Sequence, residues 1–270
     1  MAIGTKGRIE FGSDFTAGID SQVPAATGEW LAGGIGLVGV NEGALNSTVD
    51  EPGGILDITT DVGDDDNEVL VAGAFKPADG GMWMECRFKI PDSVAAARAA
   101  VWIGFVETLS KTTPVMPSER ATATTTFNNV GGMLGVMFDS DSTLLEFFGV
   151  AGDGQANLAN KDYLGAVGGA NGIQLTGAAG IPGGTIATAD RFYIVRVEID
   201  PNGLGRVYFG DYDGGASLTK PLKLVLENTT ALGTGDNFHA IALIENRSAA
   251  NERLEVDYFV GEAGRDWSAN

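Results

Sequence analysis

The sequence has few of the residues on which several protein classes depend. Its 270 residues include one cysteine, Cys86, and one histidine, His239. A single cysteine excludes an internal disulfide framework, and the two residues together cannot supply a zinc site built from cysteine and histidine. Basic residues are also scarce, with 17 against 36 acidic ones and a formal net charge of −19. Because no basic cluster offsets this charge, which repels phosphate, nucleic acid is not expected as a partner.

Long apolar runs are missing as well. No stretch approaches the about 18 consecutive apolar residues of a membrane-spanning helix, so no membrane partner is expected. The first residues, MAIGTKGRIEFGSDF, lack a basic region followed by an apolar one, which is the pattern of a secretory signal. The sequence therefore predicts a soluble protein made in the cytoplasm.

The residues that are present favour an all-β fold. Forty glycines and short apolar runs separated by Asn, Asp and Gly are typical of strands joined by turns. Apolar and polar residues alternate along GMWMECRFKI (81–90), which predicts a strand with one buried face. Cys86 falls on the apolar face and is interpreted as a packed thiol. Similar signals occur at 7–12, 29–40, 54–61, 67–75, 101–108, 132–139, 143–150, 191–200, 205–212, 219–227, 237–245 and 252–260.

These segments predict two stacked sheets in a single β-sandwich domain at residues 21–270, preceded by an extended N-terminal arm at 1–20. Two stretches interrupt the strand rhythm, at about 109–129 and 151–190, and predict long loops of functional or partner-contacting character. Helix-forming composition occurs at 93–100, where it predicts at most a short helical connector.

Two pairs of acidic residues raise the question of glycoside hydrolysis. Glu198 and Asp200 share one face of a predicted strand, and Glu255 begins a similar pattern. Retaining glycosidases need two carboxyl groups about 5 to 5.5 Å apart. Pro201 ends the first strand before another acid appears, and Glu262 lies at an odd offset from Glu255, so it points to the other face of an extended strand. No catalytic residue is predicted.

Two further motifs have simple structural interpretations. The glycines of residues 34–39 match the spacing Gly-x-Gly-x-x-Gly, but no amphipathic helix follows, so we interpret this segment as a glycine-rich strand. A serine–histidine triad would have to use His239, which lies in the apolar segment FHAIALIEN (238–246). No Gly-x-Ser-x-Gly motif accompanies it, and a structural role is predicted.

The acidic run at 61–68 contains Asp64, Asp65 and Asp66. Carboxylate oxygens suit Ca²⁺, but the run lacks the ligand spacing of an EF-hand loop. We interpret it as an exposed acidic turn, with a calcium site as the weaker alternative, and expect no other cofactor.

The four tryptophans are candidates for stacking on sugar rings. Trp83 is the best of them because it lies on the polar face of its strand, whereas Trp30, Trp102 and Trp267 have no such placement. An exposed ring on a concave sheet could bind a pyranose, and an interface with another protein is an equally good interpretation.

Taken in order, seven segments resemble the strands of a concanavalin-like (laminin-G/glucanase-type) jelly roll. They are GEWLAGGIGLVG, GILDITTD, MWMECRFKI, VWIGFVE, GVMFDSD, RFYIVRVEIDPNGLGRVYFGD and NERLEVDYFVGEAG. Within this class the chain most resembles the capsid decoration, or cement, proteins of tailed bacteriophages, on the acidic composition, the short N-terminal segment and the missing catalytic acids. The resemblance implies an antiparallel β-sandwich over most of residues 25–262.

The resemblance also implies a function. The expectation is a non-enzymatic virion structural protein that binds the outer capsid surface and stabilises the shell, with the major capsid protein and neighbouring copies of itself as partners, as a homo-oligomer. Fold alone does not settle function, since such jelly rolls also include lectins and glycosidases. The alternative is therefore a carbohydrate-binding module or glycoside hydrolase of the jelly-roll class, with a host glycan as ligand.

Overall fold

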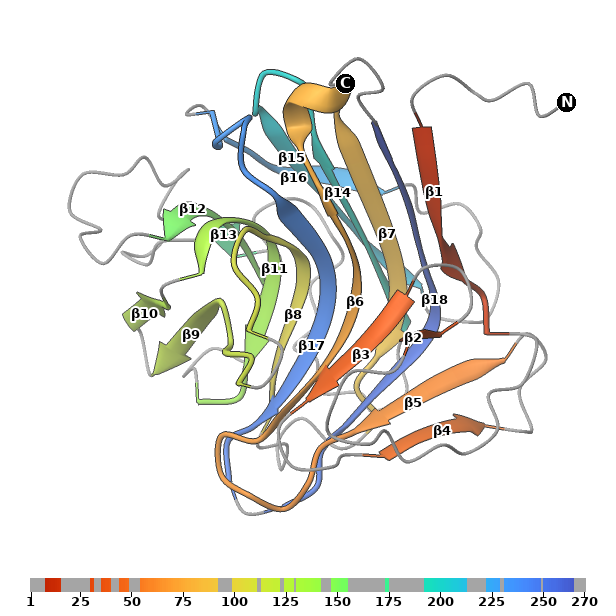
Figure 1. Ribbon diagram of the computed structural model, residues 1–270. Coiled ribbons are helices and arrows are strands. Elements are labelled where there is room, and N and C mark those ends of the chain that lie inside the picture. Colours follow the sequence, from red (N-terminus) through yellow and green to blue (C-terminus); the bar gives the residue numbers. More distant parts are fainter. Residues whose placement is uncertain are drawn as a thin grey trace, which may run out of the picture.

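The structure is a computed structural model that describes residues 8–15, 30–31, 35–39, 44–48, 54–91, 99–110, 113–121, 124–128, 130–141, 147–154, 173–174, 192–212, 222–228, 231–248 and 250–264. Sixteen of the eighteen described strands form two stacked sheets, and every pairing is antiparallel, as the sequence predicted (Figure 1). The only described helix is the short 3₁₀ turn η1 (Pro77–Asp79), and no described helix has the length to cross a membrane.

The first sheet, called sheet A here, has the strand order β16-β15-β14-β7-β18-β5-β4, with β1 paired to β18. Its strands are β1 (Arg8–Ser13), β4 (Ala44–Thr48), β5 (Ile55–Thr59), β7 (Met82–Lys89), β14 (Phe192–Ile199), β15 (Gly205–Tyr212), β16 (Lys223–Glu227) and β18 (Arg253–Gly264). Burial alternates strictly along β7 and β14, so one face of sheet A is buried and the other is partly exposed.

The second sheet, called sheet B, has the order β13-β12-β11-β8-β17-β6-β3-β2. Its strands are β2 (Trp30–Leu31), β3 (Ile35–Gly39), β6 (Asn67–Phe75), β8 (Ala99–Val106), β11 (Gly131–Asp139), β12 (Phe147–Gly154), β13 (Ile173–Gln174) and β17 (Phe238–Asn246). β3 confirms the interpretation of the Gly-x-Gly-x-x-Gly segment as a strand, since it pairs with β6 along its length.

The main core lies between the sheets and includes Cys86, which is fully buried as predicted. Burial raises the pKa of the Cys86 thiol well above its usual value. β8 is buried at every position, and β11 and β17 at nearly all, so sheet B is apolar on both faces. His239 is the exception in β17, because it is partly exposed rather than enclosed.

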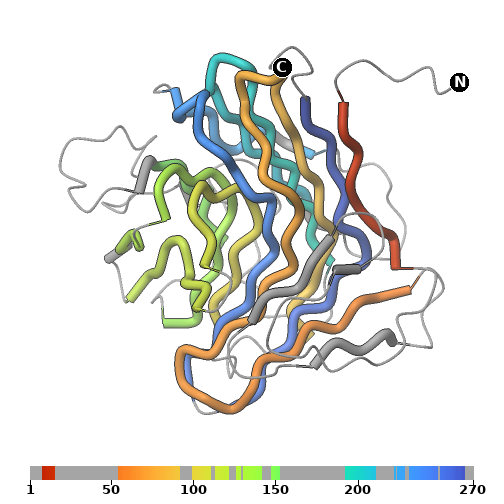
Figure 2. Tube along the Cα trace, viewed as in Figure 1, coloured from red at the N-terminus to blue at the C-terminus, as the bar shows by residue number. Residues whose placement is uncertain are grey.

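The described part of the expected N-terminal arm belongs to the sandwich. Residues 8–13 form β1, which pairs with β18 from Arg8 opposite Gly264 to Ser13 opposite Phe259. Figure 2 shows these two strands side by side although they lie near opposite ends of the chain. Phe11 is buried and stacks on Phe75 with ring centroids 5.1 Å apart, so its apolar surface holds this segment in the core.

The expected loops also contain structure. Within 109–129, β9 (Ser118–Ala121) and β10 (Thr124–Phe127) form an antiparallel hairpin. Most of 151–190 lies outside the described residues, apart from the end of β12 and β13. The helical connector expected at 93–100 is described only at Ala99 and Ala100, which begin β8 instead.

A second apolar cluster covers the outer face of sheet B. The cluster combines alternate residues of β6, β8, β11, β12 and β17 with Met116 and Val130 from outside the sheet. Leu109 and Phe127 pack against it. In Figure 1 the strands β6, β8 and β17 bow, and the β9–β10 hairpin lies on the inner side of the bow. The described residues between 109 and 130 therefore cover the concave face of this sheet.

Candidate functional site

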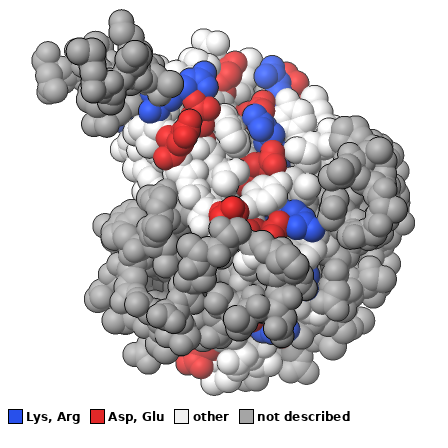
Figure 3. Space-filling view, turned by 90° about the vertical axis from the view of Figure 1, so that its right-hand side faces the viewer, with Lys and Arg blue, Asp and Glu red and all other residues white. Residues whose placement is uncertain are grey.

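The outer face of sheet A carries charged and aromatic side chains that remain partly exposed. They come from alternate positions of β7, β14, β15 and β18, the positions whose neighbours along each strand enter the core. Figure 3 views the molecule from the side of β1 and β18 and shows acidic and basic side chains gathered in a band down this face. This face therefore offers side chains that could bind a polar ligand.

One row of side chains crosses this face in direct register. Each residue is the pairing partner of the next, in the order Glu10, Glu262, Trp83, Glu198, Arg206 and Glu227. Residues directly opposite one another on antiparallel strands point to the same face. The row, called the Trp83 row here, therefore places a tryptophan between two glutamates on a single surface.

Trp83 is held by contacts on its edge and on its ring. Its indole Nε1 donates a hydrogen bond to Oε2 of Glu262 over 3.3 Å. The guanidinium of Arg196 lies 4.3 Å from the ring centroid, which is the geometry of a cation–π contact. The indole is thereby fixed in orientation while it remains partly exposed.

The two glutamates beside Trp83 are each paired with an arginine. Oε1 of Glu262 lies 2.5 Å from Nη1 of Arg8, and Oε1 of Glu198 accepts a hydrogen bond from Nε of Arg196 over 2.7 Å. Tyr208 donates its hydroxyl to Oε2 of Glu198 over 3.4 Å, and burial followed by the Glu198 charge raises the pKa of that hydroxyl. Both carboxylates are arranged as anchored hydrogen-bond acceptors.

Two hollows adjoin Trp83, and Trp83 and Glu262 line both of them. The first has a volume of about 260 Å³ and is also lined by Arg8, Glu198, Asp200, Pro201 and Arg206. The second has a volume of about 520 Å³ and is also lined by Glu10, Gly12, Ser13 and Asp14. A partly exposed aromatic ring between polar hollows can stack on one part of a ligand while carboxylates accept hydrogen bonds from the rest.

The other part of the face is closed by contacts among its own side chains. Arg87 pairs with Asp257 at 2.5 Å and lies 4.0 Å from the ring centroid of Phe192. Tyr258 donates its hydroxyl to Glu85 over 2.7 Å, and burial together with this bond raises the pKa of Tyr258 far above its usual value. These groups are paired among themselves and support the face, whereas the hollows of the face adjoin the Trp83 row.

The acid pairs considered from the sequence have structural partners. Oδ1 of Asp200 accepts backbone hydrogen bonds from Asn202 at 2.8 Å and Leu204 at 2.9 Å, so this residue organises the turn between β14 and β15. Glu255 is largely buried and pairs with Lys89 at 2.8 Å. What the sequence did not reveal is that Glu198 and Glu262, from different strands, flank Trp83.

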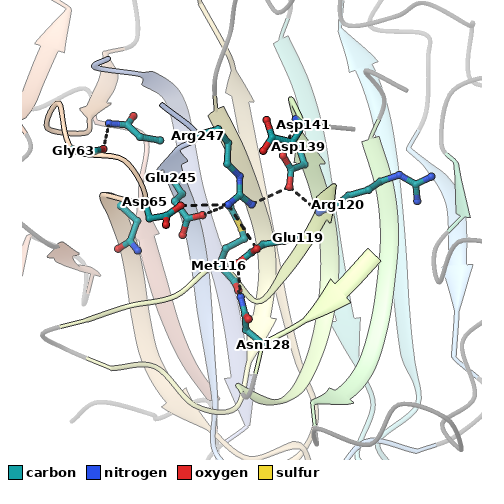
Figure 4. A network of polar contacts seen from close by, with 12 residues as sticks. Gly63, Asp65, Met116, Glu119, Arg120, Asn128, Asp139, Asp141, Glu245 and Arg247 are labelled. Atoms are coloured by element: carbon teal, nitrogen blue, oxygen red, sulfur yellow. Dashed lines mark hydrogen bonds and ion pairs between the residues drawn. The ribbon is translucent and has the colours of Figure 1, made fainter. Parts of the chain in front are cut away.

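A second polar centre lies at one end of sheet B, around Arg247 (Figure 4). This side chain is 8% exposed and contacts carboxylates from three elements. It lies 2.9 Å from Asp139 of β11, 2.7 Å from Glu245 of β17 and 3.8 Å from Glu119 of β9. The ion pairs join the hairpin to the two strands beneath it, and we call this group the Arg247 cluster.

The carboxylates of the Arg247 cluster are strongly affected by their surroundings. Burial raises the pKa of Glu245 to about 7, although Arg247 acts to lower it, and Glu119 and Asp65 raise it further. Burial also raises the pKa of Asp139. Asp139 additionally accepts a hydrogen bond from the backbone N–H of Arg120 over 2.7 Å, which ties it to the hairpin.

The acidic run considered for calcium lies beside this cluster. Asp64 and Asp65 are exposed, Asp66 is buried, and Asp65 lies 3.9 Å from Arg247. The backbone of the turn is fastened to Asn246, whose N–H donates to the carbonyl of Asp66 over 2.8 Å. Within the described residues, no group of three or more His, Cys, Asp or Glu side chains is arranged to hold a metal ion. The calcium site stays a prediction.

The remaining tryptophans differ from Trp83. Trp102 is fully buried in the apolar cluster on the outer face of sheet B, so its ring is not accessible to a ligand. The side chain of Trp30 and all of Trp267 lie outside the described residues. Trp83 lies on the outer face of sheet A, whereas Met116 and Val130 from outside the sheet cover the outer face of the bowed sheet B.

Comparisons with known proteins identify the fold. No protein-family model and no curated protein matches the sequence. The chain is similar in structure to a protein of unknown function from Shewanella oneidensis MR-1, with a TM-score of 0.58 and 13% identity over 100% of this chain and 92% of the other. It is also similar to the carbohydrate recognition domain of Emp47p, with a TM-score of 0.51 and 13% identity over 94% and 97%.

The potassium-bound carbohydrate recognition domain of Emp46p gives a TM-score of 0.50 and 12% identity over 89% of this chain and 95% of that one. Identities this low show a shared fold. The fold is a concanavalin-like antiparallel β-sandwich, which confirms the fold class that the sequence predicted. The likeness to phage capsid proteins stays a prediction.

Proposed function

We propose that the protein is a lectin-like carbohydrate-binding protein whose site is the Trp83 row on sheet A. The observation that carries this proposal is the placement of a partly exposed, orientationally fixed Trp83 between Glu198 and Glu262, with a hollow on either side. An aromatic face packs against the apolar C–H groups of a sugar, and carboxylates accept hydrogen bonds from its hydroxyls.

The fold supports the same proposal. Emp46p and Emp47p, which share the sandwich, are carbohydrate recognition domains. Fold alone does not decide function, so the proposal depends on the site. Here the site belongs to a sheet face whose supporting side chains are mutually paired, which preorganises the exposed ring and acids.

Binding is favoured over hydrolysis by the contacts of the two glutamates. A glycosidase of the two-carboxylate type needs one carboxyl group as a proton donor to the leaving oxygen. Glu198 is ion-paired with Arg196, and Glu262 with Arg8, and both also accept a neutral hydrogen bond. Both carboxylates therefore act as hydrogen-bond acceptors and neither is arranged as a proton donor, which supports a non-enzymatic role.

The proposal is tested by glycan-array screening followed by titration calorimetry with the sugars that bind. Trp83→Ala should abolish binding, and Glu198→Gln should weaken it, while Leu224→Ala, which alters an exposed apolar residue outside both hollows, should bind as the wild type does. Far-ultraviolet circular dichroism establishes that each variant is folded. Absence of binding to any glycan at millimolar concentration, or full binding by Trp83→Ala, would contradict the proposal. A reducing-sugar assay should show no hydrolysis.

The virion role predicted from the sequence stays a prediction. It expects the major capsid protein and copies of this chain as partners, a homo-oligomer and a place on the capsid surface. The N-terminal segment was expected to contact the capsid. Its residues 8–13 form β1, whose backbone pairs with β18 of the same chain.

A further inference from the structure

The direction of the Trp83 row constrains the shape of a glycan that would bind there. The row crosses β1, β18, β7, β14, β15 and β16 roughly at right angles to the strands, because each member is the direct pairing partner of the next. With neighbouring strands about 4.8 Å apart, the five intervals extend over about 24 Å. A ligand that follows the row is therefore elongated and lies across the strands.

The two hollows extend the accessible surface to either side of Trp83. The first extends from Arg8 on β1 past Trp83 to Glu198 and Arg206 on β14 and β15, and the second lies along β1 and β18, where Glu10 and Val260 line it. Trp83 and Glu262 line both hollows, so one ligand can occupy both only by passing over this pair. A single sugar ring would engage one hollow, whereas a linear chain of sugars would engage both.

The charges along the hollows constrain the chemistry of the glycan. The second hollow is lined by the acids Glu10, Asp14 and Glu262 and by no basic residue. Glu10 and Glu262 are directly opposite one another on neighbouring strands, where like charges repel. A carboxylate, sulfate or phosphate on the ligand would add to this repulsion, whereas hydroxyl and ammonium groups would donate hydrogen bonds to the acids.

The first hollow does not reverse this preference. Its two arginines already contact acids, Arg8 with Glu262 at 2.5 Å and Arg206 with Glu227 at 3.5 Å. Glu198 and Asp200 add two further negative charges to its lining. The chain as a whole carries a formal net charge of −19, which repels anionic polymers over longer distances.

From the row and the hollows we infer that the ligand is a linear oligosaccharide of neutral or amino sugars, laid across the strands of sheet A over Trp83, and that acidic glycans are excluded. This inference rests on the proposed carbohydrate-binding function and specifies the substrate class of the same site. The length of the chain and the absence of negative charge are the two properties that the face selects.

The test uses the full chain and three series of oligosaccharides, in each of which a disaccharide is compared with a hexasaccharide. The series are glucosamine oligomers, N-acetylglucosamine oligomers and galacturonic acid oligomers. The glucosamine hexasaccharide should bind roughly tenfold more tightly than the disaccharide, or more, a difference of about 1.4 kcal/mol. The N-acetylglucosamine series should show the same dependence on length, and the galacturonic acid series should not bind.

Two substitutions at the end of the row sharpen the test. Glu10→Gln should weaken the binding of the glucosamine hexasaccharide. Glu10→Lys should weaken this binding further and should permit the galacturonic acid hexasaccharide to bind. The matched control is Asp64→Asn, which removes an exposed acid from a turn that lines neither hollow, and it should bind as the wild type does. Glu10 is exposed, so neither substitution at this position should prevent folding.

The outcomes separate the inference from the proposed function. The inference is overturned, and the proposed function stands, if binding requires Trp83 but does not depend on the length of the oligosaccharide. The same holds if galacturonic acid oligomers bind as tightly as glucosamine oligomers. Binding of no oligosaccharide in any series, or on the array, overturns both. Equal effects of Glu10→Gln and Asp64→Asn would show that only the overall charge matters, and would also overturn the inference.

Discussion

The outer faces of the two sheets are built in opposite ways. On sheet B the outer face is apolar, and Met116 and Val130 from outside the sheet pack over it. On sheet A the outer face carries charged and aromatic residues, and hollows remain beside Trp83. In this sandwich the covered outer face of sheet B adds apolar burial, while the outer face of sheet A keeps polar groups accessible. The comparison supports the outer face of sheet A as the place of the proposed site.

The ionic groups on the two faces also have different consequences. Those of the Arg247 cluster are buried, so removal of one partner leaves charges without compensation in a region of low polarity. Those near Trp83 are partly exposed, and exposed ion pairs contribute little to the free energy of unfolding. Substitutions on the two faces should therefore differ greatly in their effect on stability.

The largest expected effect is that of Arg247→Met. The side chain is 8% exposed and its partners Asp139 and Glu245 are 2% and 5% exposed, so the substitution leaves two buried carboxylates without their cation. The free energy of unfolding should fall by about 3 to 5 kcal/mol, measured by urea denaturation at neutral pH. The control is Arg206→Met on sheet A, where arginine and Glu227 are 39% and 47% exposed. Its loss should stay below about 1 kcal/mol. Similar losses of unfolding free energy in both variants would contradict the proposed difference between the two faces.

The next effect concerns the pH dependence of stability. The pKa of Glu245 is raised from 4.5 to about 7 in the folded state. Between these values the folded chain binds more protons than the unfolded chain, so the free energy of unfolding falls as the pH rises. The contribution of Glu245 is fully present below pH 4.5 and is lost as the pH passes 7.

Glu245→Gln should remove this dependence. The difference in unfolding free energy between wild type and variant should change by about 3 kcal/mol across this window, in favour of the variant at the higher pH. Urea denaturation at several pH values measures it. Leu224→Ala, at a site 48% exposed, alters no titrating group, and its unfolding free energy should change with pH as that of the wild type does. A parallel curve for Glu245→Gln as well would show that the cluster does not titrate in this window.

A smaller loss is expected where the covering segment meets sheet B. Met116 is fully buried in the outer cluster of that sheet. Met116→Ala leaves a cavity and should lower the free energy of unfolding by about 2 to 3 kcal/mol. Cleavage by a protease within residues 109–130 should become faster, because the segment opens more often. Val115→Ala, at a neighbouring position 45% exposed, is the control and should be cleaved like the wild type.

The sequence predicted those features that depend on one strand at a time. Alternation placed Trp83 and Cys86 on opposite faces of β7, and the glycine-rich segment 34–39 was predicted as a strand, which β3 (Ile35–Gly39) confirms. It did not predict that Glu262 would be the partner of Trp83, because pairing register is set by the packing of distant strands and not by spacing within one strand.

The covered face of sheet B was missed for a related reason. FHAIALIEN is apolar on both faces, which predicts burial on both sides but does not indicate what covers the second side. The stretch at 109–129 has the composition of a loop, yet Met116 and the hairpin within it complete that cluster. Arg247 and Asp139 are 108 positions apart, so their ion pair has no local signal.

Apart from the controls, the smallest expected loss of stability is that of Trp83→Ala, the variant expected to abolish sugar binding under the proposed function. Trp83 is only partly buried, and the substitution removes the cation–π contact with Arg196 and one hydrogen bond to Glu262. These are worth about 1 to 2 kcal/mol in total at a partly exposed site. Trp102→Ala, at the fully buried tryptophan of sheet B, should cost about 3 to 5 kcal/mol. Urea denaturation of both variants measures the contrast directly. If the two losses were equal, Trp83 would be a structural residue, and the face of sheet A would have to be regarded as a second closed surface.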